Sequence, residues 1–206
     1  MNIFDKYYKR YDRWYDKNKY AYLSELEAIR KVLPTKGRGL EIGVGTGRFA
    51  APLGITAGID PSKNMIRLAT QRGVDARRGY GECVPFRNAA FNYVAIIITL
   101  CFVQSPKKVL KESKRVLKKN GTLIIGIIDK NSFLGTWYQK KKSAFYKKAH
   151  FFSVQEVTDL LKATRFNRFV YYQTIFKLPG TITSIEKPRK GSGKGSFVVI
   201  ASRKYE

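Results

Sequence analysis

The sequence contains few residues of the kinds that bind metals or form disulfides. Its 206 residues include two cysteines, Cys83 and Cys101, and one histidine, His150. The two cysteines are predicted to lie in different elements, and they do not have the spacing of metal ligands with the histidine. We therefore expect neither a metal site nor a disulfide.

Long apolar segments are also missing. The longest apolar run, Val94 to Val103, is too short to cross a bilayer, which takes ~20 residues. The N-terminal segment MNIFDKYYKR lacks the apolar core of a signal peptide. We therefore expect a cytoplasmic protein that does not enter a membrane.

Acidic residues are scarce relative to basic ones. The chain has 15 Asp and Glu residues against 40 Lys and Arg residues, which gives a formal net charge of +25 at pH 7. Such a charge attracts anionic partners, including RNA, at low salt. However, no motif of a known RNA-binding module is present, and lysine-rich solvated surfaces are also common in thermophile proteins. RNA binding and a merely solvated surface therefore both stay open.

The residues that are abundant predict a packed α/β protein. Hydrophobic residues make up 44% of the chain, with 13 Phe and 13 Tyr, which excludes a disordered chain. Apolar runs alternate with amphipathic segments, so we expect residues 1–206 to form a single α/β domain with a largely parallel sheet. Helices are predicted within 1–33, 62–72, 106–119 and 153–163, and strands at 40–42, 55–60, 74–77, 91–99, 122–128, 166–177 and 195–204. No helix joins the last two strands, which are therefore predicted to be antiparallel.

The segment 40–47, LEIGVGTG, is typical of a strand that brings a nucleotide-like ligand to a glycine loop. Glycines allow a tight turn and a close approach of the backbone to a ligand. Residues 48–51 are then expected to begin a helix whose free N–H groups point at that ligand. Asp60 closes the next apolar segment, where a carboxylate can accept both ribose hydroxyls of an adenosine.

Two cofactors fit this pattern. The spacing Gly45-x-Gly47-x-x-Ala50 satisfies the dinucleotide fingerprint, so a non-catalytic nucleotide- or NAD-binding domain is one interpretation. The chain is short for the usual dehydrogenase pair of domains, which counts against NAD. Starting instead at Glu41, the pattern is Glu-x-Gly-x-Gly-x-Gly.

This second pattern resembles motif I of class I S-adenosylmethionine (SAM)-dependent methyltransferases, in the broad group that includes ubiquinone- and menaquinone-biosynthesis enzymes. Further segments match the group in the right order: Tyr11-Asp12-Arg13-Trp14, Asp60-Pro61-Ser62 with Met65, Gly81-Glu82-x-x-Pro85-Phe86, Phe91-Asn92, and Arg115-Val-Leu-Lys-x-x-Gly121. The resemblance implies a Rossmann-like class I fold. Its sheet would have seven mostly parallel strands with the last strand antiparallel, helices on both faces and an N-terminal helical lid. The cofactor would be SAM, and the product S-adenosylhomocysteine.

The resemblance also implies which residues bind SAM. Glu41 would anchor the loop or meet the methionine amine, Asp60 would bind the ribose, and Thr99 would lie by the methionyl tail. The expected cofactor-binding set is Glu41, Gly43, Val44, Gly45, Gly47, Asp60, Pro61, Met65, Gly81, Glu82 and Thr99. Met65 would serve the adenine or simply the core. Tyr80 and Asn92 replace aspartates that are common in relatives, and residues 99–102 lack the motifs of enzymes that methylate adenine, glutamine or cytosine C5.

Aromatic residues near the N-terminus and in 130–150 are the candidates for acceptor recognition. We expect residues 1–33 to form a helical lid and 130–150 to form an insertion that covers the substrate. The predicted substrate residues are Tyr11, Trp14, Tyr15, Trp137 and Tyr138, although a helical aromatic stripe also suits a core. If the acceptor must lose a proton, the candidate bases are Asp129, Tyr146 and His150. No sequence motif supports any of the three. The sequence predicts a methyltransferase that acts on a small molecule, with an RNA methyltransferase as the alternative.

Overall fold

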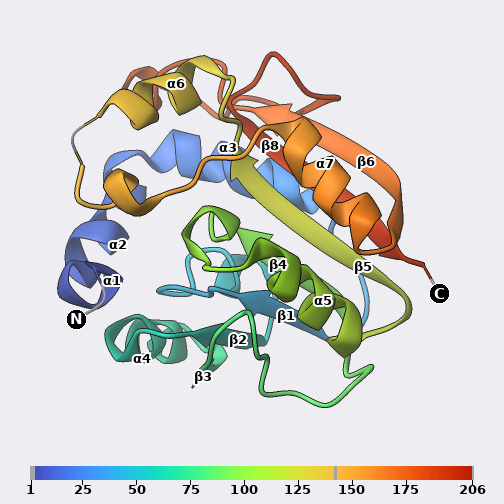
Figure 1. Cartoon of the computed structure of the whole chain (residues 1–206). Coiled ribbons are helices and arrows are strands. Elements are labelled where there is room, and N and C mark those ends of the chain that lie inside the picture. Colours follow the sequence, from blue (N-terminus) through green and yellow to red (C-terminus); the bar gives the residue numbers. More distant parts are fainter. Residues whose placement is uncertain (1–2, 142, 206) are drawn as a thin grey trace.

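A computed structural model describes residues 3–141 and 143–205 of the chain, which fold around one eight-stranded sheet (Figure 1). The strand order is β3-β2-β1-β4-β5-β8-β6-β7. The strands are β1 (Gly39–Ile42), β2 (Ala57–Asp60), β3 (Asp75–Arg78), β4 (Phe91–Ile97), β5 (Leu117–Ile128), β6 (Phe166–Thr174), β7 (Arg189–Lys190) and β8 (Phe197–Lys204).

The sheet has a parallel part and an antiparallel part. Strands β3, β2, β1, β4 and β5 pair in parallel, whereas β8 is antiparallel to β5, and β6 is antiparallel to β8. This confirms the predicted Rossmann-like class I fold. The strand beyond the predicted seven is β7, a two-residue addition that pairs with β6.

Helices cover both faces of the sheet, as predicted. They are α1 (Ile3–Lys6), α2 (Tyr8–Lys17), α3 (Lys19–Arg30), α4 (Lys63–Gln71), α5 (Pro106–Val116), α6 (Phe133–Lys140) and α7 (Val154–Ala163), with short 3₁₀ turns η1 (Ala51–Leu53), η2 (Leu100–Phe102), η3 (Tyr146–Lys148) and η4 (Pro179–Thr181). No helix among the described residues is long and apolar enough to span a membrane.

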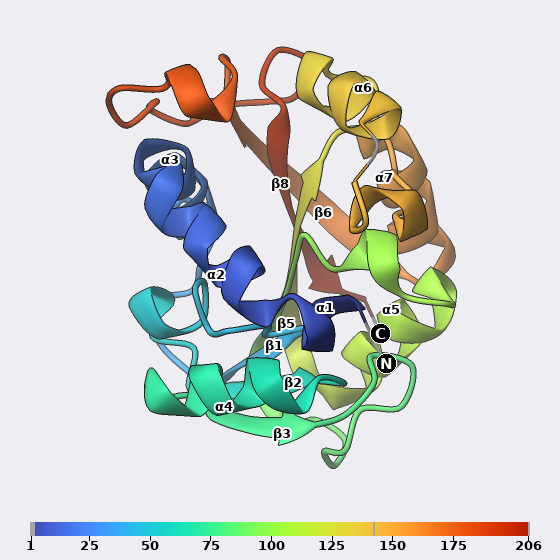
Figure 2. The same cartoon turned by 90° about the vertical axis from the view of Figure 1, so that its left-hand side faces the viewer.

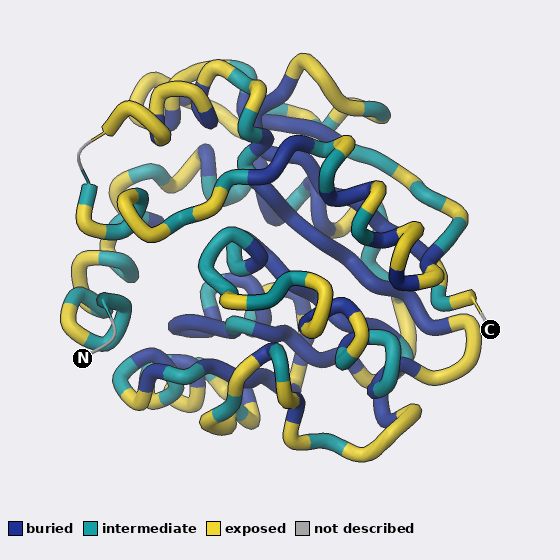
Figure 3. Tube along the Cα trace, viewed as in Figure 1, coloured by how far each residue is buried: buried dark blue, intermediate teal, exposed yellow. Residues whose placement is uncertain are grey.

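Alternate side chains of the central strands point to opposite faces and form two apolar cores. Val94 and Ile96 of β4 pack with α5 and α7, whereas Ala95 and Ile97 pack on the face covered by α3, α4 and α6. Figure 3 shows that the buried segments gather in these central strands, while the outer helices and loops alternate between buried and exposed positions. A strand that is covered on both faces reads as a continuous apolar run, which explains why β4 was recognisable from the sequence.

Two predicted helices differ from the structure. The helix expected from residues 48–51 is only a turn followed by the 3₁₀ turn η1, which ends at Gly54 with φ +68°. The helix expected over 106–119 ends at Val116, and β5 begins directly at Leu117 instead of at Thr122. The N–H groups of Ala89 and Ala90 bond the carbonyls of Arg115 and Val116, so these carbonyls pair with the segment before β4 and not with a further helical turn.

The N-terminal helices cross the end of the sheet at which the parallel strands finish. Figure 2 looks onto this side and shows α1 and α2 between α4 and α6. Asp12 of α2 accepts hydrogen bonds from Thr46, Arg48 and Arg72, at distances between 2.6 and 2.9 Å. Asp5 of α1 accepts one from Ser62 at 2.6 Å. Two aspartates therefore fasten the N-terminal segment to the loops that follow β1 and β2.

Candidate active site

The glycine loop after β1 is held by main-chain hydrogen bonds to β2. The N–H groups of Gly43 and Val44 donate to the Ile59 carbonyl at 2.8 and 2.9 Å. Gly43 has φ +73°, and a Cβ at this position would overlap the Thr99 side chain. Only glycine fits there, because both the backbone angle and the approach of the loop to the end of β4 exclude a side chain.

Asp60, at the carboxyl end of β2, fixes the tip of this loop. Its Oδ2 accepts the Gly45 N–H at 3.0 Å, and its Oδ1 accepts the Ser62 N–H at 2.9 Å. Burial raises the pKa of Asp60 to about 6, although these two hydrogen bonds act in the opposite direction. Each carboxylate oxygen has a further lone pair, so the group can still accept hydroxyl hydrogens from a ligand.

Glu41 of β1 is a buried carboxyl that lacks a complete set of partners. The residue is 1% exposed, and its Oε2 has no hydrogen bond to any described residue. Burial raises the pKa of Glu41 well above its ordinary value, and the charge of Asp60 adds to this shift. An orphaned buried oxygen beside a glycine cradle fits a ligand that carries an amine donor, as the methionyl end of SAM does.

The other predicted cofactor residues differ in the contacts that they make. Thr99 follows β4, and its hydroxyl donates toward the Ile97 and Gly43 carbonyls at 3.0 and 3.3 Å. Met65 is 1% exposed and packs inside the protein. Glu82 uses its Oε1 to accept the N–H groups of Gln104 and Ser105, so its carboxylate is engaged at the start of α5. The remaining predicted positions, Gly47, Pro61 and Gly81, lie after β1, after β2 and after β3.

A cavity of about 640 Å³ lies between the sheet end and the covering segments. Its volume is within the range of small-molecule sites. All five predicted substrate residues line it: Tyr11, Trp14, Tyr15, Trp137 and Tyr138. Thr99 is the member of the predicted cofactor set that reaches its wall. The cavity therefore begins beside the glycine loop and extends toward α3, α6 and η4.

A pair of tyrosines separates the glycine loop from the depth of the cavity. The hydroxyls of Tyr11 and Tyr15 are 2.7 Å apart, and their rings meet edge to face. A Cβ on Gly45 would lie 3.6 Å from the Tyr11 ring, so this ring covers the loop. Burial raises the pKa of both hydroxyls above the ordinary value of 10, which keeps them protonated as hydrogen-bond donors.

The three predicted bases lie in different surroundings. Tyr146 lines the cavity and stacks on Tyr138 with ring centroids 4.3 Å apart, and burial raises its pKa, which does not suit a proton acceptor. Asp129 lies outside the cavity lining, where its Oδ1 accepts the Asn131 N–H at 3.2 Å before α6. His150 is exposed, and its ring contacts Phe152 at 4.6 Å. No hydrogen bond or ring contact joins these three residues to one another.

The two cysteines differ in their surroundings, and Cys101 is not set up as a nucleophile. Cys83 is exposed, while Cys101 lines the cavity and has its pKa raised to about 12 by burial. A thiol with such a pKa is not ionised at neutral pH. Among residues 3–141 and 143–205, no group of three His, Cys, Asp or Glu side chains could hold a metal ion.

Glu25 is a cavity residue that the sequence analysis missed. It lies in the middle of α3 and is 2% exposed. Its spacing relative to Tyr22, Leu26 and Ile29 is that of one helical face, so the sequence contained a signal for its inward position. A glutamate on the apolar face of a helix is unusual, because carboxyl groups are almost never fully buried unless they are paired.

The comparisons with known proteins agree with this geometry. A family model described as a methyltransferase domain matches residues 40–125. A Methanocaldococcus jannaschii protein described as uncharacterized is 48% identical over 206 residues, which cover 99% of this chain and 100% of that protein. A Thermotoga maritima crystal structure described as a SAM-dependent methyltransferase, possible histamine N-methyltransferase, is 46% identical, with a TM-score of 0.96 over 98% of this chain and 99% of that one. A demethylmenaquinone methyltransferase of Thermotoga maritima is 32% identical over 109 residues, 48% of this chain and 46% of that protein.

The order of the strands, the glycine loop after β1 and the Asp60 carboxylate at the end of β2 together define a Rossmann-like methyltransferase domain. The chain belongs to the SAM-dependent methyltransferases. It is therefore an enzyme whose cofactor is S-adenosylmethionine and whose second substrate is a methyl acceptor. This outcome confirms the resemblance noted from motif I and the segments that follow it, and it decides against NAD.

Proposed function

We propose that this enzyme methylates a small molecule that binds in the aromatic cavity. The observation that carries the proposal is the position of the cavity: it starts at Thr99, against the glycine loop, and its walls are mostly apolar and aromatic side chains. A compact apolar site with a few polar groups is typical of small-molecule recognition. The description of the Thermotoga maritima relative as a possible histamine N-methyltransferase also supports a small acceptor.

In this proposal, different residues around the cavity have different roles in the reaction. SAM supplies a methyl group that is already activated on its sulfonium, so the protein must mainly bring two molecules together and align them. Glu41 and Asp60 offer acceptor oxygens to the amine and ribose of the cofactor. Tyr11 and Tyr15 keep water from the space between glycine loop and cavity. In this proposal α1, α2 and residues 130–150 form the lid that selects the acceptor.

Methyl transfer from labelled SAM tests the proposal directly. The purified chain is incubated with pools of small amines, phenols, alcohols and thiols, and separately with total RNA, and labelled products are counted. We expect transfer into a small-molecule pool. Efficient labelling of RNA without labelling of any small-molecule pool would contradict the proposal and favour the RNA alternative, which rests on the net charge of +25.

Two cysteine variants locate the acceptor. Cys101 lines the cavity and Cys83 does not, so Cys101→Phe fills acceptor space while Cys83→Phe changes an exposed position. We expect Cys101→Phe to raise the KM for the small acceptor on the order of tenfold, because overpacking a bound volume costs ~1–3 kcal/mol. Affinity for S-adenosylhomocysteine, measured by calorimetry, should stay within about threefold of wild type in both variants. Equal KM values in the two variants would place the acceptor elsewhere.

A further inference from the structure

Glu25 of α3 lines the cavity, and one oxygen of its buried carboxyl has no hydrogen-bond partner among the described residues. Glu25 lines the cavity, is 2% exposed, and its Oε2 makes no hydrogen bond to any described residue. A buried carboxyl without a partner lowers stability, since its lost hydration is not replaced. A group that enters the cavity with a hydrogen to donate would supply the missing partner.

The surroundings of Glu25 are aromatic and come from three different elements. Beyond the effect of burial, the charge of Glu25 raises the pKa of Tyr15 on α2, Tyr138 on α6 and Tyr146 on η3, so its carboxyl lies near all three hydroxyls. Its charge acts in the same way on Tyr11 and Tyr22. Burial alone raises the pKa of Glu25, to about 8, without any cation that lowers it.

We propose that Glu25 binds a protonated amine of the acceptor, which makes compact amines the acceptor class of this enzyme. The inference rests on the proposed function, because it takes the cavity as the acceptor site. An ammonium group offers a positive charge and three donors, whereas a hydroxyl offers one donor and no charge. The aromatic side chains around the cavity attract a cation further, through their ring faces. A ligand carboxylate, in contrast, would be repelled by Glu25.

The position of Glu25 relative to the glycine loop agrees with this role. Burial is the main cause of the raised pKa of the Tyr11 hydroxyl. The charges of Glu41, Asp60 and Glu25 raise it further. Tyr11 therefore lies within electrostatic reach of both the predicted cofactor carboxyls and Glu25. An acceptor with its ammonium on Glu25 would extend its apolar body along the cavity toward Thr99, where the loop begins.

Proton release gives the inference a signature that does not depend on turnover. In the empty cavity Glu25 is mostly protonated at pH 7, since its pKa is about 8. An ammonium favours the carboxylate, so Glu25 must lose its proton to solvent when the amine binds as a cation. About 0.9 proton should therefore be released for each amine bound at pH 7. The tyrosines of the cavity wall stay protonated at this pH, and so does Cys101, whose pKa burial raises to about 12. The wall also carries two cationic side chains, Arg10 and Lys141.

Titration calorimetry with matched ligands tests the inference. The probes are phenethylamine and isoamylamine, each compared with its alcohol, phenethyl alcohol and isoamyl alcohol, in two buffers of different ionisation enthalpy. Each titration is done with and without S-adenosylhomocysteine. The test variant is Glu25→Gln, and the matched control is Glu27→Gln, because Glu27 lies on the same helix with a side chain 38% exposed and paired with Arg30.

The expected result is an amine preference that depends on Glu25 alone. Wild type and Glu27→Gln should bind at least one amine on the order of tenfold tighter than its alcohol, with proton release. Glu25→Gln should lose both the preference and the release. If Glu25→Gln does not fold, Glu25→Met takes its place as the test variant, because it removes the carboxyl at similar side-chain volume.

Three outcomes overturn the inference: alcohols bind as tightly as amines, Glu25→Gln behaves like Glu27→Gln, or no amine of the panel binds at millimolar concentration under either condition. Failure of S-adenosylhomocysteine to bind is a separate result, which counts against the proposed function. The titrations without it still decide the role of Glu25, so the two failures are distinguishable.

Discussion

Buried carboxyl groups are the residues that most clearly separate this site from an ordinary core. Glu25, Glu41 and Asp60 are each at least nine-tenths buried, and none forms an ion pair with another described residue. Burial raises the pKa of all three. Natural proteins keep such destabilising groups where binding or catalysis needs them, so their position at one end of the sheet marks the functional region.

The raised pKa of Glu25 predicts that stability falls as pH rises. Between its ordinary value of 4.5 and about 8, the folded protein holds a proton on Glu25 that the unfolded chain has lost. The free energy of unfolding should therefore decrease across this window, by up to about 1.4 kcal/mol per pH unit for this one group. Urea unfolding of ligand-free protein at several pH values measures the slope.

Glu25→Gln isolates this effect from every other group. We expect the variant to be similar to wild type near pH 5 and more stable near pH 8, because it has no proton to lose. Glu27→Gln, at a side chain that is 38% exposed, should follow the wild-type curve. Parallel curves for wild type and Glu25→Gln would show that the carboxyl is not held neutral.

Asp60 yields a prediction about cofactor affinity. Both of its oxygens accept backbone N–H groups, so Asp60→Asn turns one acceptor into a donor that faces Gly45 or Ser62. The ribose hydroxyls also lose an acceptor. We expect affinity for S-adenosylhomocysteine to fall on the order of a hundredfold, ~2.7 kcal/mol, measured by calorimetry. Asp75→Asn, on an exposed aspartate paired with Arg77, is the control and should bind normally; equal affinities would remove Asp60 from the cofactor site.

At the scale of elements, two aspartates connect the N-terminal helices to the loops that follow β1 and β2. Asp12 of α2 accepts bonds from Thr46, Arg48 and Arg72. Burial raises the pKa of Asp12, but the hydrogen bonds from both arginines and from Thr46 outweigh it and hold the pKa well below its ordinary value. The carboxylate is therefore ionised and bound at neutral pH. A rigid α2 over the glycine loop follows from this cluster.

Asp12→Ala should loosen α2 from the loop. With the Asp12 side chain 15% exposed, we expect a loss of about 2 kcal/mol in stability, less than for a fully buried pair because of solvent screening. S-adenosylhomocysteine should also dissociate several times faster, as stopped-flow displacement can measure. Asp16→Ala is the matched control, because Asp16 also bonds Arg48 but is 62% exposed. An unchanged dissociation rate in Asp12→Ala would mean that α2 does not hold the cofactor in place.

The ends of elements were predictable only where a local interaction sets them. The helices predicted to begin near 153 and 62 do begin there, because Ser153 and Glu156 form a capping box at the start of α7 and Ser62 caps α4. The end of α5 is different, because Lys118 and Lys119 are good helix formers but lie in β5. Pairing of Leu117 with Phe91 of β4 overrides that propensity, and such long-range pairing leaves no local signal.

The same distinction applies to the site. The juxtaposition of the glycine loop and Asp60 was predictable, because both follow the ends of neighbouring parallel strands, and the structure joins them through the Gly45 N–H and Asp60 Oδ2. The aromatic lining was predictable as a set, since aromatic residues stand out in two segments that cover the sheet end. Glu25 was not recognised, because helical spacing places it on an apolar face but says nothing of a cavity there. The cavity exists only once α3, α6 and η4 pack together.

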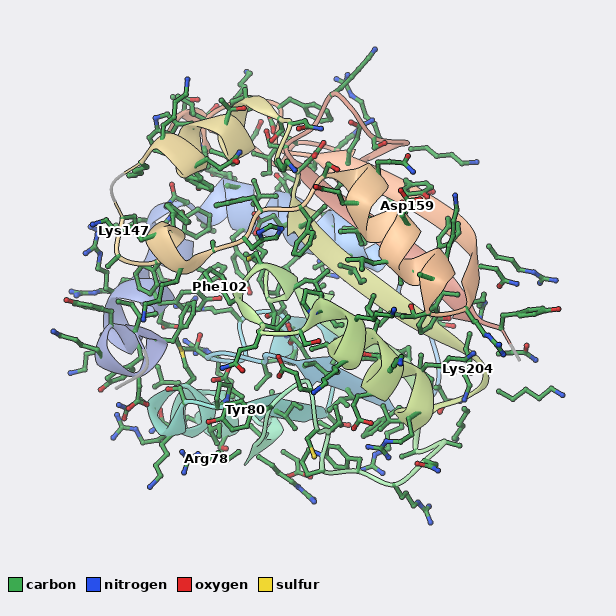
Figure 4. All side chains as sticks on the ribbon, in the orientation of Figure 1. Arg78, Tyr80, Phe102, Lys147, Asp159 and Lys204 are labelled. Carbon is green, nitrogen blue, oxygen red and sulfur yellow. The ribbon has the colours of Figure 1, made fainter. Side chains whose placement is uncertain are left out.

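At the scale of the whole molecule, the net charge of +25 surrounds a site whose walls are mostly apolar. Basic side chains project around the whole outline of the protein, with Lys147 and Lys204 on opposite sides (Figure 4). Basic side chains are therefore spread around the outline of the molecule in the view of Figure 4. A field of this sign attracts polyanions from all directions and opposes the approach of a cation.

Salt should consequently act in opposite directions on RNA and on the acceptor. Binding of RNA should weaken steeply between about 0.05 M and about 0.5 M salt, because it depends on counterion release. Binding of phenethylamine should strengthen modestly over the same range, since screening reduces the repulsion that a cation meets before it reaches Glu25. Phenethyl alcohol, which carries no charge, should bind equally well throughout. Fluorescence anisotropy with labelled RNA and calorimetry with the two small ligands measure these trends. An amine affinity that falls with salt as RNA affinity does would mean that an anionic surface patch, and not the buried carboxyl, binds the cation.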